Sequence, residues 1–427
     1  MNINRDIEEL VSAGVIPRET ADKIRNYYHQ KSGQSQNRLL VVFGILGAIL
    51  VGLGIMLIIA HNWDNFSRTV KTILAFIPLV AGQAICGYTL IKRPDSMAWR
   101  ESGTAFLFFA VGGSISLVSQ IYNIPGNLGS FLLTWMLLCL PLIFVMRSSI
   151  TSLLFLIGIT AYACETGYWT YPATESYLYW LLLLPVLLHY YLLALKRPES
   201  NFLIFHHWLI PLSVIVVLGT LAKDTESLMF AGYMSLFGLF YQVGNTLFFR
   251  NQKPGNNGFR ILGSAGTLIL LLVMSFDGVW DSINHQILYF SEVILSPELI
   301  ALVILTGLAT VLLMIQRRRQ PLAGLNPMEP VFILFLIIYI ISLYWSNAFI
   351  LVNLLVFAIG VLKVREGAAL SHLGILNLGL LIITALIVCR FFDTDLTFVV
   401  RGILFVSVGI GFFVANFRIL QKRKENG

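Results

Sequence analysis

Long apolar runs recur along the whole chain, and they constrain its fold more than any other feature of the sequence. A bilayer core about 30 Å thick is crossed by roughly 20 apolar helical residues, and fourteen stretches of about this length occur. They cover residues 39–60, 69–91, 103–121, 128–146, 148–164, 177–195, 203–222, 227–249, 258–275, 297–316, 328–345, 347–365, 370–391 and 396–417. Lipid cannot satisfy the open edge of a sheet, and these runs lack the alternation of a transmembrane barrel. The sequence therefore predicts an all-α polytopic membrane protein with about 14 transmembrane helices.

The supply of charged side chains agrees with this fold class. Of the 427 residues, 57% are hydrophobic and 12% are charged, and the mean hydropathy is +0.79. Soluble proteins carry roughly 25% charged residues, so this chain cannot cover a soluble domain of its size with ionised groups. A soluble enzyme, a disordered chain and a disulfide scaffold are therefore excluded.

The positions of the basic residues predict the topology. All but five of the 29 lysines and arginines lie before the first span, in the even-numbered connections or after the last span. The exceptions are Arg68, Lys71, Lys223, Arg390 and Arg401. Because basic residues concentrate on the cytoplasmic side, both termini are predicted to lie in the cytoplasm. The net charge of +7 then indicates contact with anionic membrane lipid, and it indicates no nucleic acid.

The chain is predicted to divide into a short cytoplasmic segment and a large membrane domain. Residues 1–38 form a helical hairpin and a polar linker, and residues 39–427 form the multi-span domain. Gly14 interrupts the apolar helical spacing of the hairpin, and Pro17 can open its second helix. About 30 residues cannot bury a core of their own. The hairpin therefore docks either on the protein's own inner loops or on a cytoplasmic protein partner that binds residues 1–32.

Polar residues gather near the first hairpin of spans, at the end that is predicted to face outside. The turn and the start of the second span read HNWDNFSRTVK, which contains Asp64, Arg68 and Lys71. The third span ends with Gln120 and Tyr122 at the same membrane face. One interpretation is a ligand or acid–base site at an outer opening. The alternatives are ion pairs that fix helix ends and a glutamine that only packs between helices.

The last hairpin carries a second polar group. It reads RFFDTD from Arg390 to Asp395, and Arg401 follows inside the last span. At 1.5 Å per residue, Arg401 lies roughly 7 Å into that span. Charges inside a membrane usually face a partner or a cavity. Arg401 is therefore expected either to bind an anionic ligand or to reach back and pair with Asp393 or Asp395.

The remaining motifs give no positive indication of chemistry. The chain has no P-loop, no zincin motif, no Cys-x-x-Cys and no nucleophile elbow, so no catalytic residue, cofactor or metal site is predicted. His189 could meet His206 or His207 in a metal or proton site, although interfacial histidines without function are the favoured interpretation. Cys164 and Cys389 both end spans at the outer face, and whether they pair is left open.

One connection predicted to lie outside is longer than a turn. Residues 276–296 place Trp280, Ile283 and Ile287 at helical spacing, with polar residues between them. This pattern predicts an amphipathic helix that lies on the outer surface as an interfacial anchor. A lid over a cavity is the alternative.

Four stretches carry a resemblance to known proteins: GVIPRETADKI, LGIMLIIAHNWDNFSRTVK, GGSISLVSQIYNIPGNLGSFLLTW and the C-terminal CRFFDTDLTFVVRGILFVSVGIGFFVAN. The first three resemble a bacterial family of predicted membrane proteins, known as domain of unknown function 2157, and the last is similar to the same and a sister family. The resemblance covers roughly residues 1–150 and 340–420. It implies a multi-pass protein of the bacterial inner membrane, and it implies no reaction.

The favoured interpretation is a carrier or flippase-like protein for a small anionic or lipid-linked ligand, with a polar site at the extracytoplasmic face. The candidate ligand-binding residues are Asp64, Arg68, Lys71, Gln120, Tyr122, Arg390, Asp393 and Arg401. A non-catalytic scaffold or regulator that binds a partner through residues 1–32 is one alternative. An outer-face membrane transferase is the other, and the sequence leans against an enzyme. Convergence of these residues on one cavity would separate a carrier or a transferase from a scaffold.

Overall fold

The structure is a computed structural model that describes most of the chain between residues 65 and 393. The described residues are 10–24, 65–169, 177–222, 225–249, 252–284, 296–318 and 326–393, with isolated positions at 7, 43, 46, 47, 50, 57, 293, 294, 399, 402, 403, 406, 409–411 and 413. The side chains at 282, 284 and 391–393 are not among the described groups.

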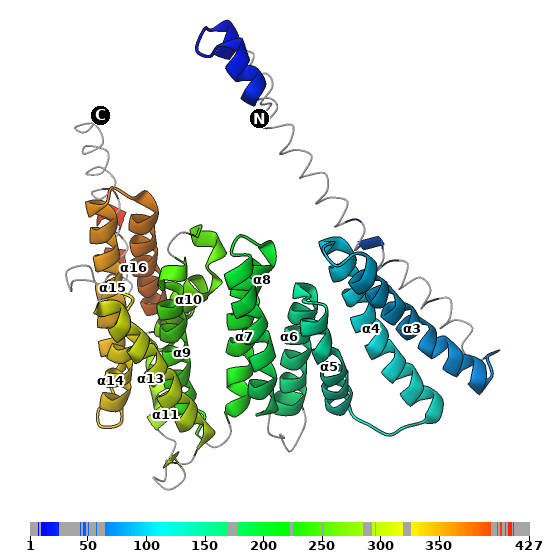
Figure 1. Cartoon of the computed structure of the whole chain (residues 1–427). Coiled ribbons are helices and arrows are strands. Elements are labelled where there is room, and N and C mark those ends of the chain that lie inside the picture. Colours follow the sequence, from blue (N-terminus) through cyan, green and yellow to red (C-terminus); the bar gives the residue numbers. More distant parts are fainter. Residues whose placement is uncertain are drawn as a thin grey trace. The chain divides into compact units, whose positions relative to one another are not determined.

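Every regular element in these ranges is a helix, as Figure 1 shows. The long helices are α3 (Arg68–Lys92), α4 (Met97–Tyr122), α5 (Leu128–Val145), α6 (Ser149–Cys164), α7 (Leu178–Lys196), α8 (Asn201–Leu218), α9 (Leu228–Gly244), α10 (Gly258–Val273), α13 (Pro297–Arg317), α14 (Val331–Ser342), α15 (Phe349–Ala369) and α16 (Leu373–Asp393). The short elements are η2 (Glu165–Trp169), η3 (Gly219–Leu221), η4 (Leu247–Phe249), η5 (Pro254–Asn256) and α11 (Asp277–Asn284). The predicted all-α class is confirmed.

Twelve of the fourteen predicted spans coincide with a described helix. The other two, residues 39–60 and 396–417, lie outside the described residues apart from isolated positions. Eight described segments are long and apolar enough to cross a membrane, and α9, α10 and α14 are shorter apolar helices. A polytopic α-helical membrane protein is therefore supported, while the count of 14 and the cytoplasmic termini stay predictions. The predicted domain boundary at residue 38 also lies outside the described part of the chain.

The N-terminal segment contains the predicted interruption of its helices. Residues 10–12 and 18–24 are helical, and the chain turns between them. Gly14 adopts a φ of +71° in this turn, a conformation that only glycine adopts without a steric cost.

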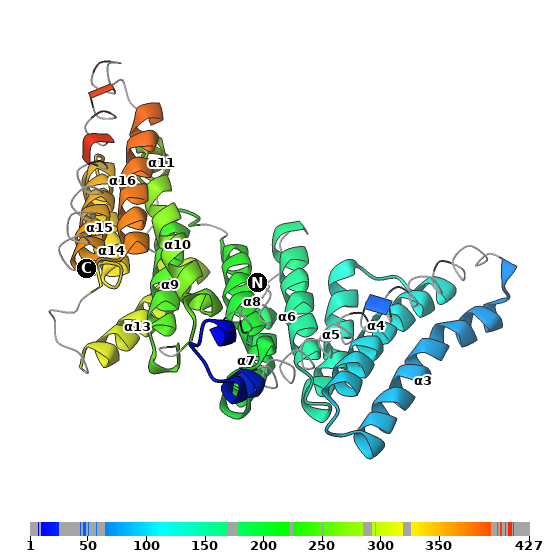
Figure 2. The same ribbon diagram turned by 90° about the horizontal axis from the view of Figure 1, so that it is seen from above.

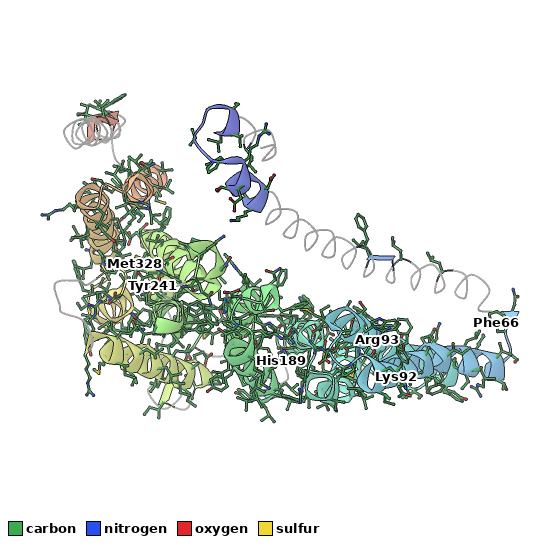
Figure 3. All side chains as sticks on the ribbon, turned by 45° about the horizontal axis from the view of Figure 1, so that its top comes forward. Phe66, Lys92, Arg93, His189, Tyr241 and Met328 are labelled. Atoms are coloured by element: carbon green, nitrogen blue, oxygen red, sulfur yellow. The ribbon has the colours of Figure 1, made fainter. Side chains whose placement is uncertain are left out.

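The chain separates into two compact units, unit 1 from Met1 to Phe155 and unit 2 from Leu156 to Gly427. In unit 1, α3 and α4 pack as an antiparallel hairpin, and Phe66 and Lys92 mark the two ends of α3 in Figure 3. Close approach is possible because a Cβ atom at Gly82 would already lie 3.1 Å from the Leu107 backbone.

Helix α5 packs against α4 in the same unit. The Trp135 indole Nε1 donates a hydrogen bond of 2.8 Å to the Phe108 carbonyl oxygen. The indole ring covers Gly112, where a Cβ atom would lie 2.5 Å from the ring. A small residue on one helix therefore receives the largest side chain of the other.

In unit 2, α9 lies among α10, α13 and α14, and α15 pairs with α16 along its length (Figures 1 and 2). Tyr241 and Met328 belong to the buried core between these helices and lie near each other in Figure 3. The buried apolar side chains of these helices form one continuous cluster, as expected where helices rather than lipid surround a span.

The predicted helix near Trp280 exists as α11, but its apolar face does not lie on the surface. Trp280 is fully buried, Ile283 is 5% exposed, and both belong to the core of unit 2. The indole donates a hydrogen bond of 2.7 Å to the Met274 carbonyl oxygen, and its ring lies 6.2 Å from the Tyr339 ring. The prediction of an interfacial anchor is wrong for this part of the connection, because helix spacing alone cannot distinguish a lipid face from a protein face.

Candidate functional site

An open groove of about 1020 Å³ lies between α3, α4 and α5 of unit 1. Most of its wall is apolar, with Phe76 and Leu79 on α3, Val111 and Ile115 on α4, and Phe131 on α5. Polar side chains line the same groove, and they include Gln83, Ser116, Gln120, Asn127, Ser130 and Thr134. The groove therefore offers both apolar contact and hydrogen bonds.

The groove follows from the faces that α3 and α4 present. Phe76, Leu79 and Gln83 have i, i+3, i+7 spacing, so they lie on one face of α3. Val111 and Ile115 lie on one face of α4 for the same reason. The two faces meet along one side of the antiparallel hairpin, and α5 completes the groove.

The turn after α4 places α5 beside the groove. Asn123 ends α4 with a left-handed φ of +51°, a conformation that asparagine tolerates better than most residues. Asn127 then begins α5 with a capping box, because its Oδ1 accepts the Ser130 amide hydrogen at 2.7 Å. Such reciprocal bonds fix where a helix starts.

Three polar side chains in the groove form no hydrogen bond to any other described residue. They are Gln83, Ser116 and Gln120, and all three are exposed. Other hydroxyls in the groove are satisfied locally, since Thr134 donates to the Ser130 carbonyl oxygen at 2.8 Å. In a membrane, an amide without a partner is costly, so these groups favour an occupant that forms hydrogen bonds.

A cationic group lies at the open end of the α3–α4 hairpin. Arg68 lies two turns before Phe76 on α3, and Thr72 lies one turn before it, so the three residues share one face of the helix. The Arg68 Nη2 donates a hydrogen bond of 3.3 Å to the Ile121 carbonyl oxygen, and the guanidinium carbon lies 5.1 Å from the centre of the Tyr122 ring. The Tyr122 and Thr72 hydroxyl oxygens lie 3.2 Å apart. The Arg68 guanidinium therefore holds a positive charge at the end of the α3 face that lines the groove.

Residues 8–152 match the family described as "Predicted membrane protein (DUF2157)". This match confirms the resemblance of the N-terminal part of the chain. No curated protein and no solved structure matches the chain. The matched residues include all of α3, α4 and α5, so the whole groove lies in the part of the chain that the family defines. The similarity of residues 340–420 to a sister family stays a prediction.

The structure brings together some of the predicted ligand-binding residues. Arg68 and Tyr122 are in contact, and Gln120 lines the groove. Lys71 lies one turn after Arg68 and is half-buried. Asp64 lies outside the described residues, so its place in this site stays a prediction.

The predicted residues near the C-terminus belong to unit 2. Arg390 donates a hydrogen bond to the Ser275 carbonyl oxygen, and its guanidinium carbon lies 5.4 Å from the centre of the Phe276 ring. Asn353 donates to the same carbonyl oxygen at 3.1 Å. These contacts join α15 and α16 to the chain after α10, and they account for an arginine at this helix end. Its role in ligand binding stays a prediction.

The Asp393 side chain and Arg401 are not among the described groups near Arg68 or Arg390. Asp393 ends α16, but its side chain is not described, and Arg401 lies outside the described residues. The predicted convergence of the two chain ends on one site therefore stays a prediction.

His189 and His206 lie close to each other, which the sequence allowed without favouring a site there. The His189 and His206 ring centres lie 5.8 Å apart. Within the part of the chain that the structure describes, no three histidine, cysteine or acidic side chains are placed to hold a metal ion. Cys164 and Cys389 do not form a disulfide bond with each other.

Sequence reasoning missed several residues of the groove, among them Gln83, Asn127 and Ser130. Gln83 shares a helix face with Phe76 and Leu79, which is visible in the sequence. The sequence does not show which helix this face meets, so a lone glutamine in an apolar run carries no signal. Asn127 carried a detectable signal, because asparagine is a preferred N-cap residue directly before an apolar helical run, whereas Ser130 carried none.

Proposed function

We propose that the chain is a carrier or flippase-like protein of the bacterial inner membrane, and that its ligand is an amphiphile with an anionic group. The observation that carries this proposal is the groove of unit 1. Its apolar walls bear three polar side chains, Gln83, Ser116 and Gln120, that no other described residue satisfies.

The chemistry of the groove supports an amphiphile rather than a small soluble ion. Apolar side chains such as Phe76 and Phe131 favour contact with an acyl or prenyl chain. The amides of Gln83 and Gln120 can bond to hydroxyl or carbonyl groups. Arg68 at the open end supplies a cation that suits a phosphate or carboxylate.

The distribution of polar groups supports movement along the groove. Gln83 follows Arg68 by fifteen residues, which is about 22 Å along the helix axis. Polar contacts are thus available both at the end of α3 and deep along it. A head group can pass between them while its apolar chain stays in contact with lipid.

Lipid exchange in proteoliposomes tests the proposal, with fluorescently labelled phosphatidylglycerol as the probe and dithionite bleaching as the measurement. We expect wild-type protein to move labelled lipid across the bilayer faster than occurs in protein-free vesicles. The double variant Gln83→Leu/Gln120→Leu should be roughly tenfold slower or worse, because two hydrogen bonds of about 1 kcal/mol each are lost.

The matched control is Gln252→Leu, the same chemical change outside the groove, and its rate should equal that of wild type. Wild-type vesicles that bleach no faster than empty vesicles would contradict the transport proposal. A double variant that is as fast as wild type would remove the groove from the transport path.

A further inference from the structure

Four buried oxygen-bearing side chains gather where α9 and α13 begin in unit 2. Glu298, in the first turn of α13, is fully buried. Thr225 and Ser227, just before α9, are 2% and 3% exposed, and Tyr339 of α14 is 4% exposed. None of these residues contributes to the groove of unit 1.

The contacts of α9 and α13 bring these residues to one place. The two helices run side by side in the same direction, since the Ser235 and Thr306 hydroxyl oxygens lie 2.8 Å apart, about two turns after the start of each helix. At the starts themselves, the Thr225 backbone amide donates a hydrogen bond of 3.3 Å to the Glu298 Oε1. A carboxylate is therefore held directly against the turn that contains the two hydroxyl residues.

Ser227 and Tyr339 extend the group. The turn is closed by a hydrogen bond of 2.9 Å from the Leu228 amide to the Thr225 carbonyl oxygen, so Thr225 and Ser227 are within one turn of each other. Ser227 is also the polar neighbour of the Tyr339 hydroxyl. The turn thus places Thr225 against Glu298, and Ser227 of the same turn lies near Tyr339.

Three hydroxyls in this set form no hydrogen bond of ordinary length and angle with a described residue. They are the Thr225 Oγ1, the Ser227 Oγ and the Tyr339 hydroxyl, and each oxygen is shielded from solvent. A buried polar atom without a partner costs about 1–3 kcal/mol. Several of them together need an explanation, and a bound ion or water is a common one.

The geometry points to a binding site for a small alkali-metal cation, Na⁺, formed by the Glu298 carboxylate and the hydroxyl oxygens of Thr225, Ser227 and Tyr339. Hard cations prefer oxygen ligands, and all four groups supply oxygen. The set contains one carboxylate, whose single negative charge matches a monovalent cation. Calcium sites usually use more acidic groups. The inference does not rest on the lipid-carrier proposal.

A buried water is the competing occupant, and the two differ in their response to salt. A cation that binds only the folded protein stabilises it in a saturable, concentration-dependent way. The experiment is a thermal unfolding titration of the full chain in detergent, in which NaCl replaces choline chloride at constant ionic strength. We expect the wild-type Tm to rise with Na⁺ and to reach a plateau.

Two variants remove oxygen ligands. Thr225→Val keeps the shape of the side chain and removes its hydroxyl, and Glu298→Gln removes the charge. In both, the rise of Tm with Na⁺ should be lost or should require at least tenfold more Na⁺. Thr225→Val alone keeps the test decisive if Glu298→Gln fails to fold.

Ser235→Ala is the matched control, because it removes a hydroxyl from the same helix pair away from the cluster. Its Tm should be lower in both salts while its dependence on Na⁺ is unchanged. Equal wild-type Tm values in NaCl and choline chloride would overturn the proposal and indicate water. A Na⁺ effect that persists unchanged in Thr225→Val and Glu298→Gln would overturn it as well.

Discussion

Single buried polar side chains hold the turns between helices in place. Glu101 of α4 is 4% exposed, and its carboxylate accepts hydrogen bonds from the Ser148 hydroxyl at 2.5 Å, the Ser149 amide at 3.2 Å and the Ile150 amide at 3.0 Å. The first amides of α6 have no partner within their own helix. Glu101 supplies that partner, and a negative charge is favourable at a helix start.

Removal of this carboxylate should destabilise the protein. For Glu101→Ala we expect a loss of about 2–4 kcal/mol, because hydrogen bonds to a charged group are lost and buried donors are left unsatisfied. Glu101→Gln keeps one acceptor oxygen and should lose about half as much. Unfolding of the detergent-solubilised chain measures both values. Glu199→Ala, an exposed acidic position, should change stability by less than about 0.5 kcal/mol, and an equal loss there would contradict the assigned role.

At the scale of elements, close packing of α15 against α16 depends on glycine. A Cβ atom at Gly379 would lie 2.6 Å from the Val364 amide nitrogen and 2.8 Å from the Gly360 carbonyl oxygen. At Gly367 it would lie 2.3 Å from the Leu376 amide nitrogen. These neighbours are backbone atoms, which cannot turn aside as a flexible side chain can. The hairpin therefore tolerates no larger residue at these positions without moving its helices apart.

Gly379→Ala should accordingly cost about 1–3 kcal/mol or more, the usual range for an overpacked site. Gly307→Ala in α13 is the control, because nothing lies within 4 Å of a Cβ atom there. That change should be neutral or stabilising by about 0.5–1 kcal/mol, since alanine favours helix. Unfolding midpoints of both variants in detergent give the comparison, and a Gly379→Ala protein as stable as wild type would show that the hairpin is less tightly packed.

Hydropathy predicts where the helices lie because each span must be long and apolar whatever it touches. It does not predict which helix a given face meets. Trp280 has the spacing of an interfacial anchor, yet its ring is buried in the core of unit 2. Gln83 looks like an isolated polar residue, yet it lines the groove with Gln120 from another helix. The sequence placed Arg68 and Tyr122 at the same membrane face, but it did not predict that they are in contact.

At the scale of the whole molecule, the remaining question is which face of the membrane each helix end meets. The connections that follow α3, α5 and α7 contain Arg93, Arg147 and Arg197, whereas the described residues between α4 and α5 include no basic side chain. Basic connections favour the cytoplasm. We therefore predict that the α3–α4 turn is cytoplasmic and the α4–α5 turn is extracytoplasmic.

Single-cysteine labelling with a membrane-impermeant maleimide tests this orientation in a background without the four native cysteines. Gly126→Cys in the α4–α5 turn should react in spheroplasts, because its Cβ atom would meet only the Ser130 hydroxyl at 3.6 Å. Asp95→Cys in the exposed α3–α4 turn should react only after the membrane is permeabilised. The opposite pattern would invert the topology, and equal reactivity at both sites would mean that α4 does not cross the bilayer.

The orientation also decides what the groove can receive. If Gly126 is extracytoplasmic, Arg68 and Tyr122 lie at that face too, because they share the open end of the α3–α4 hairpin with the α4–α5 turn. An anionic head group would then meet the cation from the extracytoplasmic leaflet. If the topology is inverted, Arg68 faces the cytoplasmic leaflet, where anionic lipid is enriched, and fluorescent phosphatidylglycerol should enter the groove from that side.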